Sequence, residues 1–568
     1  MNIYWKILGK YKRDLMVGPL LVLAGVVCET VQPRLMAEII DDGIMSRDLG
    51  VVSRVGWQMI LLSIAGLVAS IVNISLSARV STRAGADLRR ELFGAISRLS
   101  LAAVDRFGAA SLVTRLTNDV TRLQHAVMTS TRLLARAPLL FILAFVFIVE
   151  IDAGLSLLLS CIVLPVAAGC SWWISRRGAA CSREIQREVD RLTATVRENL
   201  INFRVVKASG MEGRETGKFS ARNEALRAIL ARTGNLFVLF FPVIQLAANL
   251  TLVAILWAGG LKVVDGEIKI GELVSFINYL AQVLVSLMMF SMIATNFSRA
   301  SASSVRVLEV LGAAGGERAV KGNAASGRRV TRGEILLRDV RFRFPGARDD
   351  LLEGITLRVS PGEMVAIIGH TGSGKSTLAQ LIPGLREASG GEVLVDGVNV
   401  KEYGDEELRE RVRVVLQDDE LFSGTIRDNL SWGNPAATPG EIDEATRVAC
   451  IRDFIASLPG GLDAPVARGG ANLSGGQKQR LCIARALLSN PVALILDDST
   501  SAVDAVTERM ILQNLRRGQR SLVLVTRQPR ATLEADRVVI LEAGRIVDDA
   551  PPAVLLERSR VYREICRP

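Results

Sequence analysis

The residues best suited to chemistry in this 568-residue chain form a short run of glycines, hydroxyl side chains and one lysine. The run comprises Gly369, His370, Thr371, Gly372, Ser373, Gly374, Lys375, Ser376 and Thr377. It follows the apolar stretch MVAII and precedes TLAQLI, which has a helical pattern. Glycines let successive backbone N–H groups face phosphate oxygens, lysine can reach the β- and γ-phosphates, and the serine hydroxyl can ligate Mg²⁺. We therefore predict a phosphate-binding loop between a strand and a helix.

A second group of chemically competent residues lies further along the chain. The sequence LSGGQ supplies Ser474, Gly475, Gly476 and Gln477, and the apolar run VALILDDS then ends in Asp497 and Asp498. An aspartate at a strand end is suited to hold Mg²⁺ beside the loop serine, Ser376. The serine and the glycine N–H groups are further donors for a γ-phosphate.

These motifs lie in a region with the pattern of an α/β layer structure. Strand-like runs (ILLRDVRFRF, MVAIIG, VALILDD, SLVLVT and RVVILEAG) alternate with helical segments. We predict an α/β P-loop nucleotide-binding domain over residues 333–568. The Gly-, Ala- and charge-rich residues 312–332 before it are expected to form a linker.

The remaining residues, 1–311, have the pattern of an all-α membrane domain. Their uncharged stretches are 15–28, 55–78, 137–149, 153–175, 236–261 and 273–298. Four are long enough for a helix of about 20 residues across the bilayer. The first must continue through Glu29, Arg34 and Glu38, and the third must begin near Arg132, so we expect those polar groups to face protein or water. This gives six transmembrane helices.

Charge and composition indicate that this domain lies in a membrane, and they predict its orientation. The chain has 69 Lys+Arg, 58 Asp+Glu and a net charge of +11, and much of the basic charge lies beside the apolar stretches. Basic loops mark the cytoplasmic side, which we expect to carry the nucleotide-binding domain. The amphipathic start MNIYWKILGKYKRD, without a cleavage site, is expected to form an interfacial helix. We prefer lipid to nucleic acid as the partner of this charge.

Two polar segments between spans have helical periodicity. They contain ADLRRELFGAISRLS with TRLTNDVTRLQ, and REIQREVDRLTATVRENL with VVKASGMEGRE. We expect the second to fifth spans to extend into the cytosol as long helices there. Ordinary amphipathic loop helices are the alternative. The 7 cysteines are scattered and only His125 and His370 are histidines, so neither a disulfide framework nor a His-rich metal site is predicted.

Taken in order, the phosphate-binding loop, LSGGQ and the strand ending in two acids resemble the ATP-binding cassette (ABC) transporter family, and in particular its exporter-type half-transporters. The resemblance covers almost the whole chain and implies ATP and Mg²⁺ as cofactors, with Ser376, Gln417 and Asp497 near the metal. It also implies that Phe344 stacks on adenine and that Asp504 communicates across a nucleotide-binding dimer. The segments 115–119 and 202–212 resemble the regions that couple the two domains.

Two residues depart from the family pattern. Asp498 stands where glutamate usually polarises the attacking water, and Arg527 stands where the switch histidine is usual. A misplacement of about 1 Å can cost about 100-fold in rate, and arginine has no acceptor and stays protonated. We expect this site to bind ATP and to hydrolyse it poorly.

The intact LSGGQ then suggests one half of a heterodimer. In the resemblance, each site joins the loop of one chain to the signature of the other, so this chain would complete the competent site of a second, non-identical half-transporter. The leading interpretation is a bacterial ATP-driven exporter of small hydrophobic or amphipathic compounds. Alternatives are an exporter-fold importer of siderophores or lipids, an ATP-gated regulatory or channel-like protein, and a soluble ABC ATPase acting on nucleic acid, which the six spans disfavour.

The sequence leaves the substrate open. Polar residues in or near the spans could line a cavity or bond between helices; they are Glu29, Gln32, Arg34, Gln245, Asn249, Asn278, Gln282 and Asn296. Arg34 and Glu38 are spaced to pair along one helical face.

Overall fold

A computed structural model describes residues 9–238, 240–321, 328–418 and 420–566. Contacts divide the chain into two compact units, one formed by residues 1–94 and 110–311 and the other by 95–109 and 312–568. The expected interfacial helix lies largely outside the described residues. Each unit is considered by itself below.

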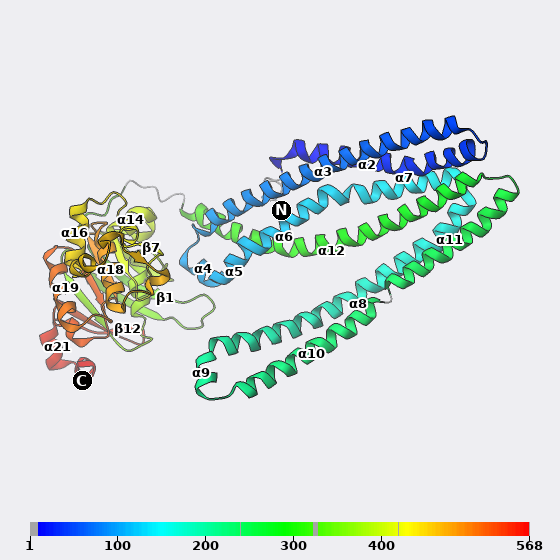
Figure 1. Cartoon of the computed structure of the whole chain (residues 1–568). Coiled ribbons are helices and arrows are strands. Elements are labelled where there is room, and N and C mark those ends of the chain that lie inside the picture. Colours follow the sequence, from blue (N-terminus) through cyan, green and yellow to red (C-terminus); the bar gives the residue numbers. More distant parts are fainter. Residues whose placement is uncertain (1–8, 239, 322–327, 419, 567–568) are drawn as a thin grey trace. The chain divides into compact units, whose positions relative to one another are not determined.

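The first unit is built from helices (Figure 1). Its α-helices are α2 (Lys12–Glu38), α3 (Leu49–Ile96), α5 (Ala109–Thr114), α6 (Val120–Thr129), α7 (Arg136–Ile151), α8 (Ala153–Ile201), α9 (Phe203–Ala208), α10 (Glu212–Val238), α11 (Phe240–Val264) and α12 (Ile270–Lys321). Three π-helical turns interrupt them: η1 (Ile39–Ile44), η2 (Arg115–Asp119) and η3 (Ser130–Leu134). The short helix α4 (Leu101–Phe107) is grouped with the second unit.

Within the described residues, five helical segments are long and apolar enough to cross a membrane. They are Lys12–Ile44, Leu49–Ile96, Ala109–Ile151, Gln245–Val264 and Ile270–Phe290. The fourth expected span, 153–175, lies on α8, many of whose side chains there are outside the described set. The 48 residues of α3 and the 49 of α8 correspond to lengths of about 70 Å at 1.5 Å per residue, more than twice the hydrocarbon thickness. The predicted long extensions of the membrane helices are therefore confirmed.

Several polar side chains in the spans bond between helices. Pro33 lacks an N–H and leaves the carbonyl of Glu29 without its helical partner. The side chain of Gln282 on α12 donates to that carbonyl at 3.4 Å, and the Tyr279 hydroxyl donates to the Thr30 carbonyl at 2.8 Å. These bonds fix α12 against α2.

The pairing expected within α2 is wrong. Arg34 lies 3.9 Å from Glu150, and Glu38 lies 3.9 Å from Arg54. Both partners belong to other helices, Glu150 to α7 and Arg54 to α3.

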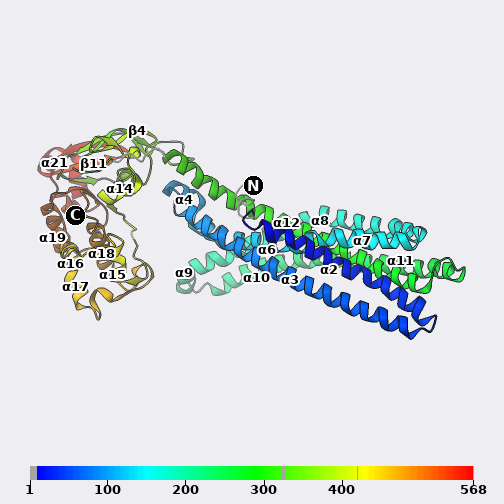
Figure 2. The same ribbon diagram turned by 90° about the horizontal axis from the view of Figure 1, so that it is seen from above.

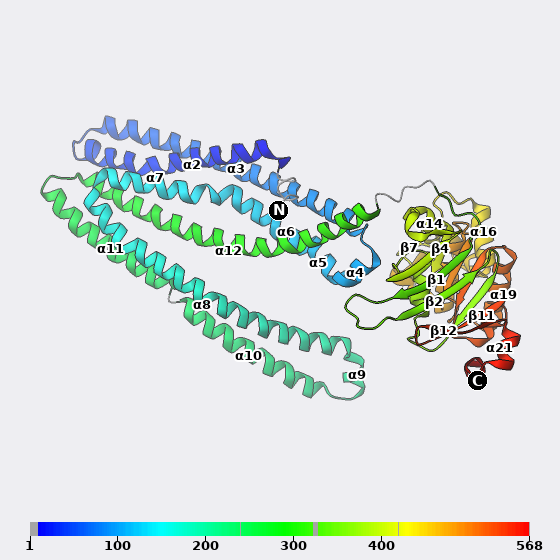
Figure 3. The ribbon, with the colours of Figure 1, turned by 180° about the vertical axis from the view of Figure 1, so that it is seen from behind.

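The helices α8 and α10 form an antiparallel pair that diverges from α2, α3, α7 and α12 toward α9 (Figures 1 and 3). Seen from above, α2 and α3 run alongside each other (Figure 2). The tip of the α8–α10 pair exposes large apolar side chains, namely Leu200, Ile201, Phe203, Val205 and Met211. We call these five residues the apolar tip. In soluble surroundings such a cluster marks a surface suited to contact another protein.

The second unit contains three sheets within its described residues. The largest has the order β12 (Arg545–Ala550), β11 (Arg537–Glu542), β3 (Met364–Ile368), β10 (Ser521–Val525), β9 (Ala493–Asp497) and β6 (Val412–Val415). The next has the order β2 (Leu352–Val359), β1 (Ile335–Phe342), β4 (Gly390–Val395) and β5 (Val398–Asn399). The third pairs β7 (Gly424–Thr425) with β8 (Pro465–Val466).

Strands β11, β3, β10, β9 and β6 are parallel, and only the edge strand β12 is antiparallel in that sheet as described. The helices of the unit are α13 (Lys375–Leu381), α14 (Asp405–Arg411), α15 (Ile426–Ser431), α16 (Pro439–Val448), α17 (Arg452–Ser457), α18 (Gly475–Leu487), α19 (Ala505–Arg517), α20 (Pro529–Thr532), α21 (Pro552–Arg558) and α22 (Arg560–Cys566), with short 3₁₀ turns at Val400–Glu402, Gly461–Asp463 and Arg468–Gly470. This is the α/β class that the alternating pattern predicts.

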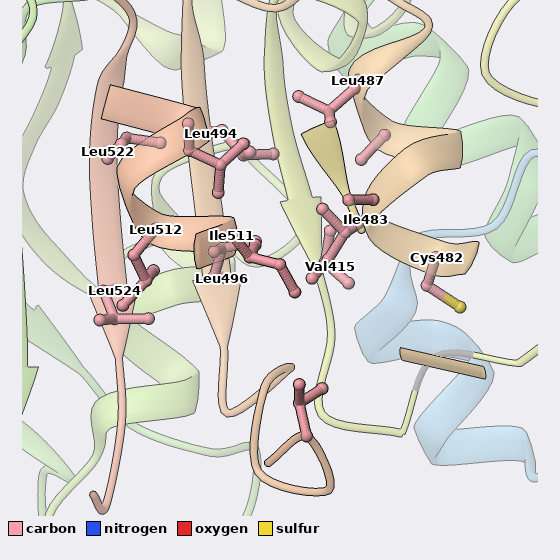
Figure 4. Close-up of a cluster of buried hydrophobic side chains, with 14 of the residues drawn as sticks. Val415, Cys482, Ile483, Leu487, Leu494, Leu496, Ile511, Leu512, Leu522 and Leu524 are labelled. Carbon is pink, nitrogen blue, oxygen red and sulfur yellow. The ribbon is translucent and has the colours of Figure 1, made fainter. Parts of the chain in front are cut away.

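A buried apolar layer fixes the strand ends that carry the chemistry. Figure 4 shows Leu494 and Leu496 of β9 and Leu522 and Leu524 of β10 facing side chains of α18 and α19. The alternate residues Ile495 and Val523 lie in a second cluster on the other face of the sheet. Because both faces are covered, β9 reads as a continuous apolar run, and its first polar residue, Asp497, emerges at its carboxyl end.

The segment expected to be a linker begins as helix. α12 continues through Lys321, past Gly312 and Gly315, and β1 begins at Ile335. Alanine, glutamate and arginine, which favour helix, are interspersed with the glycines there and sustain the helix.

Candidate functional site

The glycine-rich run forms a tight loop between β3 and α13. Gly372 and Gly374 have φ values of +88° and +100°, in the region that glycine adopts without strain. A Cβ on Gly374 would lie 2.5 Å from Cδ2 of Leu352, so a side chain there would also be blocked by packing. Both requirements explain why glycine occupies this position.

The loop encloses the lysine. Lys375 is buried, and its Nζ donates hydrogen bonds of 2.8 Å to the carbonyls of Gly369 and His370. Burial lowers the pKa of this ammonium group, and the nearby Arg527 acts in the same direction. The lysine is therefore held by carbonyls of its own loop at the wall of the cavity described below.

Two oxygen groups meet at the end of β9. The Ser376 hydroxyl donates to Oδ1 of Asp497 at 3.0 Å, and Asp497 is 1% exposed. Burial raises the pKa of this carboxyl. A hydroxyl and a carboxylate side by side are hard oxygen donors of the kind that Mg²⁺ prefers, so the residues fit that ion. Among the described residues, no cluster of three His, Cys, Asp or Glu side chains offers another metal site.

A cavity of about 180 Å³ lies over the loop. Ten residues expected at the site line it: Thr371, Gly372, Gly374, Lys375, Ser376, Thr377, Gln417, Asp497, Asp498 and Arg527. Gly369, His370 and Ser373 contribute through the loop, since the carbonyls of the first two hold Lys375 and the Ser373 hydroxyl lies 3.4 Å from its Nζ. The lining also includes Leu351, Val525 and Thr526, which have no chemical signature in the sequence and enter through the ends of β2 and β10.

The two residues that depart from the family pattern lie together in this cavity. Nε of Arg527 is 3.6 Å from Oδ2 of Asp498. Asp498 has a φ of +51°, and its N–H donates to the carbonyl of Val525 at 2.8 Å, which fixes the residue to β10. Burial raises the pKa of the Asp498 carboxyl, and the Arg527 guanidinium opposes that rise. The short carboxylate thus faces a permanent cation.

Other expected residues lie outside the cavity of this one chain. Ser474 caps α18, where its hydroxyl accepts from the Gln477 N–H at 3.3 Å and the Gln477 side chain accepts from the Ser474 N–H at 2.9 Å. A Cβ on Gly476 would lie 2.8 Å from the carbonyl of Ala502, and Gly475 is exposed beside it. Ser474 and Gly475 therefore face outward, open to a second molecule.

Asp504 has a capping role at α19. Its Oδ1 accepts from the N–H of Thr507 at 3.0 Å, and this backbone hydrogen bond lowers the pKa of the carboxyl. The side chain is exposed, as a residue that communicates with a partner would need to be.

Phe344 presents its ring at the edge of the second unit. Its side chain is partly exposed and lies edge-on to Phe342, with ring centres 5.0 Å apart. The Arg386 guanidinium lies 5.1 Å from the centre of the Phe344 ring. Sequence reasoning missed Arg386, because nothing in its local sequence links it to a residue 42 positions earlier.

Arg386 also binds α4, which belongs to the same unit. Its Nη2 lies 2.7 Å from Oδ2 of Asp105 on α4. Within the first unit, Arg115 and Asp119 bind Glu309 and Arg306 of α12. The coupling role expected of the segments 115–119 and 202–212 stays a prediction.

Profiles of known families cover both units. The profile of the ABC transporter transmembrane region matches residues 15–287, and that of the ABC transporter nucleotide-binding region, described as "ABC transporter", matches 352–501. A solved structure described as a bacterial Atm1-family ABC exporter with ATP bound superimposes with a TM-score of 0.80, covering 98% of this chain and 97% of the other at 23% identity. This likeness confirms the exporter fold.

Curated relatives extend over the whole chain. An uncharacterized ABC transporter ATP-binding protein of Bacillus subtilis is 36% identical over 549 residues, covering 97% of this chain and 95% of the relative. An ATP-dependent lipid A-core flippase of Chromobacterium violaceum is 30% identical, covering 99% and 96%. A multidrug efflux ATP-binding/permease protein of Mycobacterium tuberculosis is 33% identical, covering 100% of this chain and 47% of the relative.

Proposed function

The chain belongs to the ABC transporter family as a multi-pass membrane ATPase of exporter type, and we propose that it is the subunit of a heterodimer whose own nucleotide site binds Mg²⁺–ATP but hydrolyses it slowly. Its LSGGQ motif completes the competent site of a non-identical partner. The transported compounds are hydrophobic or amphipathic, and they leave the cytoplasmic side. The predicted importer and channel-like alternatives have no specific observation in their favour.

The Asp498–Arg527 pair carries this proposal. A general base must take a proton from the attacking water, or polarise it, from hydrogen-bond distance. Aspartate reaches one methylene less far than glutamate, and here Arg527 stands 3.6 Å from its carboxylate. A neighbouring cation favours the ionised carboxylate and so makes it a weaker proton acceptor. Both effects slow hydrolysis while the guanidinium adds positive charge for phosphate binding.

The other residues of the site are complete for binding. Lys375 is already positioned by two loop carbonyls and needs only to exchange them for phosphate oxygens. Ser376 and Asp497 would hold the Mg²⁺, which neutralises phosphate charge when bound. Gln417 lines the same cavity. ATP binding therefore depends mainly on residues other than Asp498.

Two surfaces support assembly with a second chain. The signature residues Ser474 and Gly475 are exposed and lie outside the cavity of their own chain. The apolar tip of the α8–α10 pair is exposed as well. The Mycobacterium relative, of which this chain covers 47%, has room in its own length for a second unit of this size.

The proposal is tested by comparing ATP hydrolysis of the purified chain alone with that of a complex formed with a half-transporter carrying Glu and His in the two altered places. We expect the chain alone to be nearly inactive and the complex to be active. In the complex, Asp498→Glu with Arg527→His should raise turnover at this site, by up to about 100-fold if positioning is limiting. Rapid ATP hydrolysis by the chain alone, at a rate that pairing does not raise, would contradict the proposal.

The Lys375→Ala chain is the matched control, because it weakens phosphate binding without touching Asp498 or Arg527. It should abolish most of the gain from the double substitution. A gain that survived this control in full would arise at the partner's site rather than at this one.

A further inference from the structure

A cavity inside the membrane unit contains polar groups that the unit itself does not satisfy. It measures about 210 Å³ and is lined by Leu21, Val22, Gly25, Ser70, Asn73, Ile74, Arg132, Leu133, Arg136 and Met289. These residues come from α2, α3, η3, α7 and α12, so five elements of one chain form it. Its lining separates into an apolar part, chiefly Leu21, Val22, Ile74, Leu133 and Met289, and a polar part.

The polar part has unused hydrogen-bonding capacity. Asn73 is 7% exposed, and its buried Oδ1 has no hydrogen-bond partner among the described residues. Within the same part of the chain, the buried Nε of Arg136 also has no partner, although Nη2 of Arg136 binds Glu29 at 2.7 Å. Unpaired buried polar atoms cost free energy, and in a membrane unit each one needs an explanation. A bound ligand that accepts and donates hydrogen bonds supplies one.

The charge of the cavity sets the sign of that ligand. Arg132 is half-buried and forms no ion pair or hydrogen bond with any residue that the structure describes. Arg136 is balanced by Glu29, so the local balance of these three groups is one positive charge. A cation between membrane helices is costly unless it is paired. The group that would pair with Arg132 is therefore an anion.

The backbone at this point is also specialised. Arg132 and Leu133 lie in the π-helical turn η3, which widens the helix and turns its side chains relative to those of α6. Such turns are frequent at functional sites. Gly25 of α2 also lines the cavity, and a Cβ there would lie at an ordinary contact distance, 3.7 Å, from the Ser70 hydroxyl.

We propose that this cavity binds the head of an amphiphile that carries one anionic group, such as a phosphate, sulfate or carboxylate, with its chain against the apolar part. Arg132 pairs with the anion, and Nε of Arg136 and the Asn73 amide complete its hydrogen bonds. The binding site stands on the geometry alone. Only the statement that this amphiphile is a transported substrate rests on the proposed function.

The test measures binding to the full-length chain in nanodiscs of zwitterionic lipid, with empty nanodiscs subtracting membrane partition. The probes are dodecyl phosphate, dodecylphosphocholine, dodecyltrimethylammonium and inorganic phosphate. We expect saturable binding of dodecyl phosphate, weakened about tenfold or more by Arg132→Gln, by Asn73→Leu and by the cavity-filling Gly25→Leu. Arg132→Lys should retain part of the affinity.

Arg34→Gln is the matched control, because Arg34 is also an arginine of a membrane helix but lies outside the cavity lining. It should change affinity less than twofold, and each variant is checked for the size-exclusion profile of the unaltered chain. Equal binding of the cationic or zwitterionic probe, or undiminished binding to folded Arg132→Gln, would overturn the proposal. If inorganic phosphate binds as tightly as dodecyl phosphate, the alkyl chain contributes nothing to binding. The cavity would then be a site for a small anion, and the assignment of an amphiphile would be wrong.

Failure here and failure of the proposed function give different results. If binding is absent while the heterodimer hydrolyses ATP, only the cavity assignment is wrong. If binding is present but dodecyl phosphate is not moved across vesicles by the ATP-driven heterodimer, the cavity holds a lipid of the bilayer, and the substrate assignment is wrong.

Discussion

At the scale of single residues, the nucleotide site combines two carboxyl groups whose pKa is raised with an ammonium group whose pKa is lowered. Burial raises the pKa of Asp497 and Asp498 and lowers the pKa of Lys375. Each shift favours the neutral form, so the ligand-free site holds its charges at a cost in stability. Phosphate and Mg²⁺ are the groups that would relieve this cost.

The lysine provides the simplest test of binding. Lys375→Ala removes a charge-assisted contact to phosphate, and such contacts contribute about 1.5–3 kcal/mol. We expect ATP to bind roughly 10- to 150-fold more weakly, measured with a fluorescent nucleotide on the full-length chain. Lys401→Ala, on an exposed lysine that pairs with Glu387, should leave the affinity unchanged. Equal affinities of Lys375→Ala and the unaltered chain would remove this lysine from the site.

The carboxylates predict a pH dependence whose sign can be worked out. A carboxyl whose pKa is raised by folding contributes stability below its ordinary pKa, and this contribution is lost as the pH rises through the raised value. Asp498→Asn should therefore raise the melting temperature of the nucleotide-free chain at pH 7.5, with the gain shrinking toward pH 4. Thermal unfolding at several pH values measures it.

Asp504→Asn is the matched opposite case. The Thr507 N–H lowers the pKa of Asp504, so its contribution is present above the ordinary carboxyl pKa and is lost as the pH falls through the lowered value. This substitution should lower the melting temperature at pH 7.5. A shift of the same sign for both variants would contradict the assignment.

At the scale of elements, buried ion pairs connect long helices that the sequence alone does not place together. Asp119 of η2 is 1% exposed and binds both Arg306 and Ser303 of α12. The two sides of this contact are separated by more than 180 positions in the chain. It fixes α12 where the long helix continues beyond the apolar span.

Removing the carboxylate should destabilise the membrane unit. Breaking a buried pair costs about 3–5 kcal/mol, but the Arg306 side chain is 39% exposed, so about 2–3 kcal/mol is expected for Asp119→Ala. Unfolding of the detergent-solubilised chain measures it. Glu224→Ala, which breaks an exposed pair with Arg227, should cost much less, because exposed pairs contribute little. Equal losses of unfolding free energy would mean that the Asp119 pair stabilises the unit no more than an exposed pair does.

A second ion pair joins α4 to the nucleotide-binding unit through Arg386. Because Arg386 contacts both Asp105 and the Phe344 ring, Arg386→Ala should weaken ATP binding and loosen α4, whereas Asp105→Ala should only loosen α4. Proteolysis or hydrogen exchange at 101–107 reports the second effect, and nucleotide affinity the first. An Asp105→Ala chain with weakened ATP binding would show that the two contacts are not separable.

Sequence patterns predicted the elements better than their contacts. The apolar runs gave the α/β domain and the long membrane helices because periodicity and uninterrupted hydrophobicity follow directly from burial. Arg386, Val525 and Thr526 were missed because they reach the site through tertiary packing. The contact of Arg386 with Asp105 of α4 was likewise missed, because nothing in the local sequence of α4 links it to a residue 281 positions later.

At the scale of the whole molecule, the chain in the proposed heterodimer supplies parts of two nucleotide sites rather than one complete site. Its cavity has the binding residues with an altered base, and its signature motif faces outward at the start of α18. In a heterodimer these two halves do different work, so equivalent substitutions in the two chains must have unequal effects. That asymmetry distinguishes the proposed complex from a symmetric pair.

Ser474→Ala tests the asymmetry in the assembled heterodimer. Because this serine would contact the γ-phosphate in the partner's competent site, we expect ATP hydrolysis to fall about tenfold or more, since a lost hydrogen bond to a charged group costs about 1.5–3 kcal/mol. The corresponding serine of the partner faces the slow site and should matter little.

Loss of the Ser474 helix cap by itself costs about 1 kcal/mol of stability. Thr438→Ala controls for this, because Thr438 caps α16 with the same reciprocal bonding and lies outside the cavity lining. It should lower the melting temperature similarly and leave hydrolysis intact. Equal loss of activity from the two serine substitutions would mean that both sites turn over, and the asymmetric assembly would be wrong.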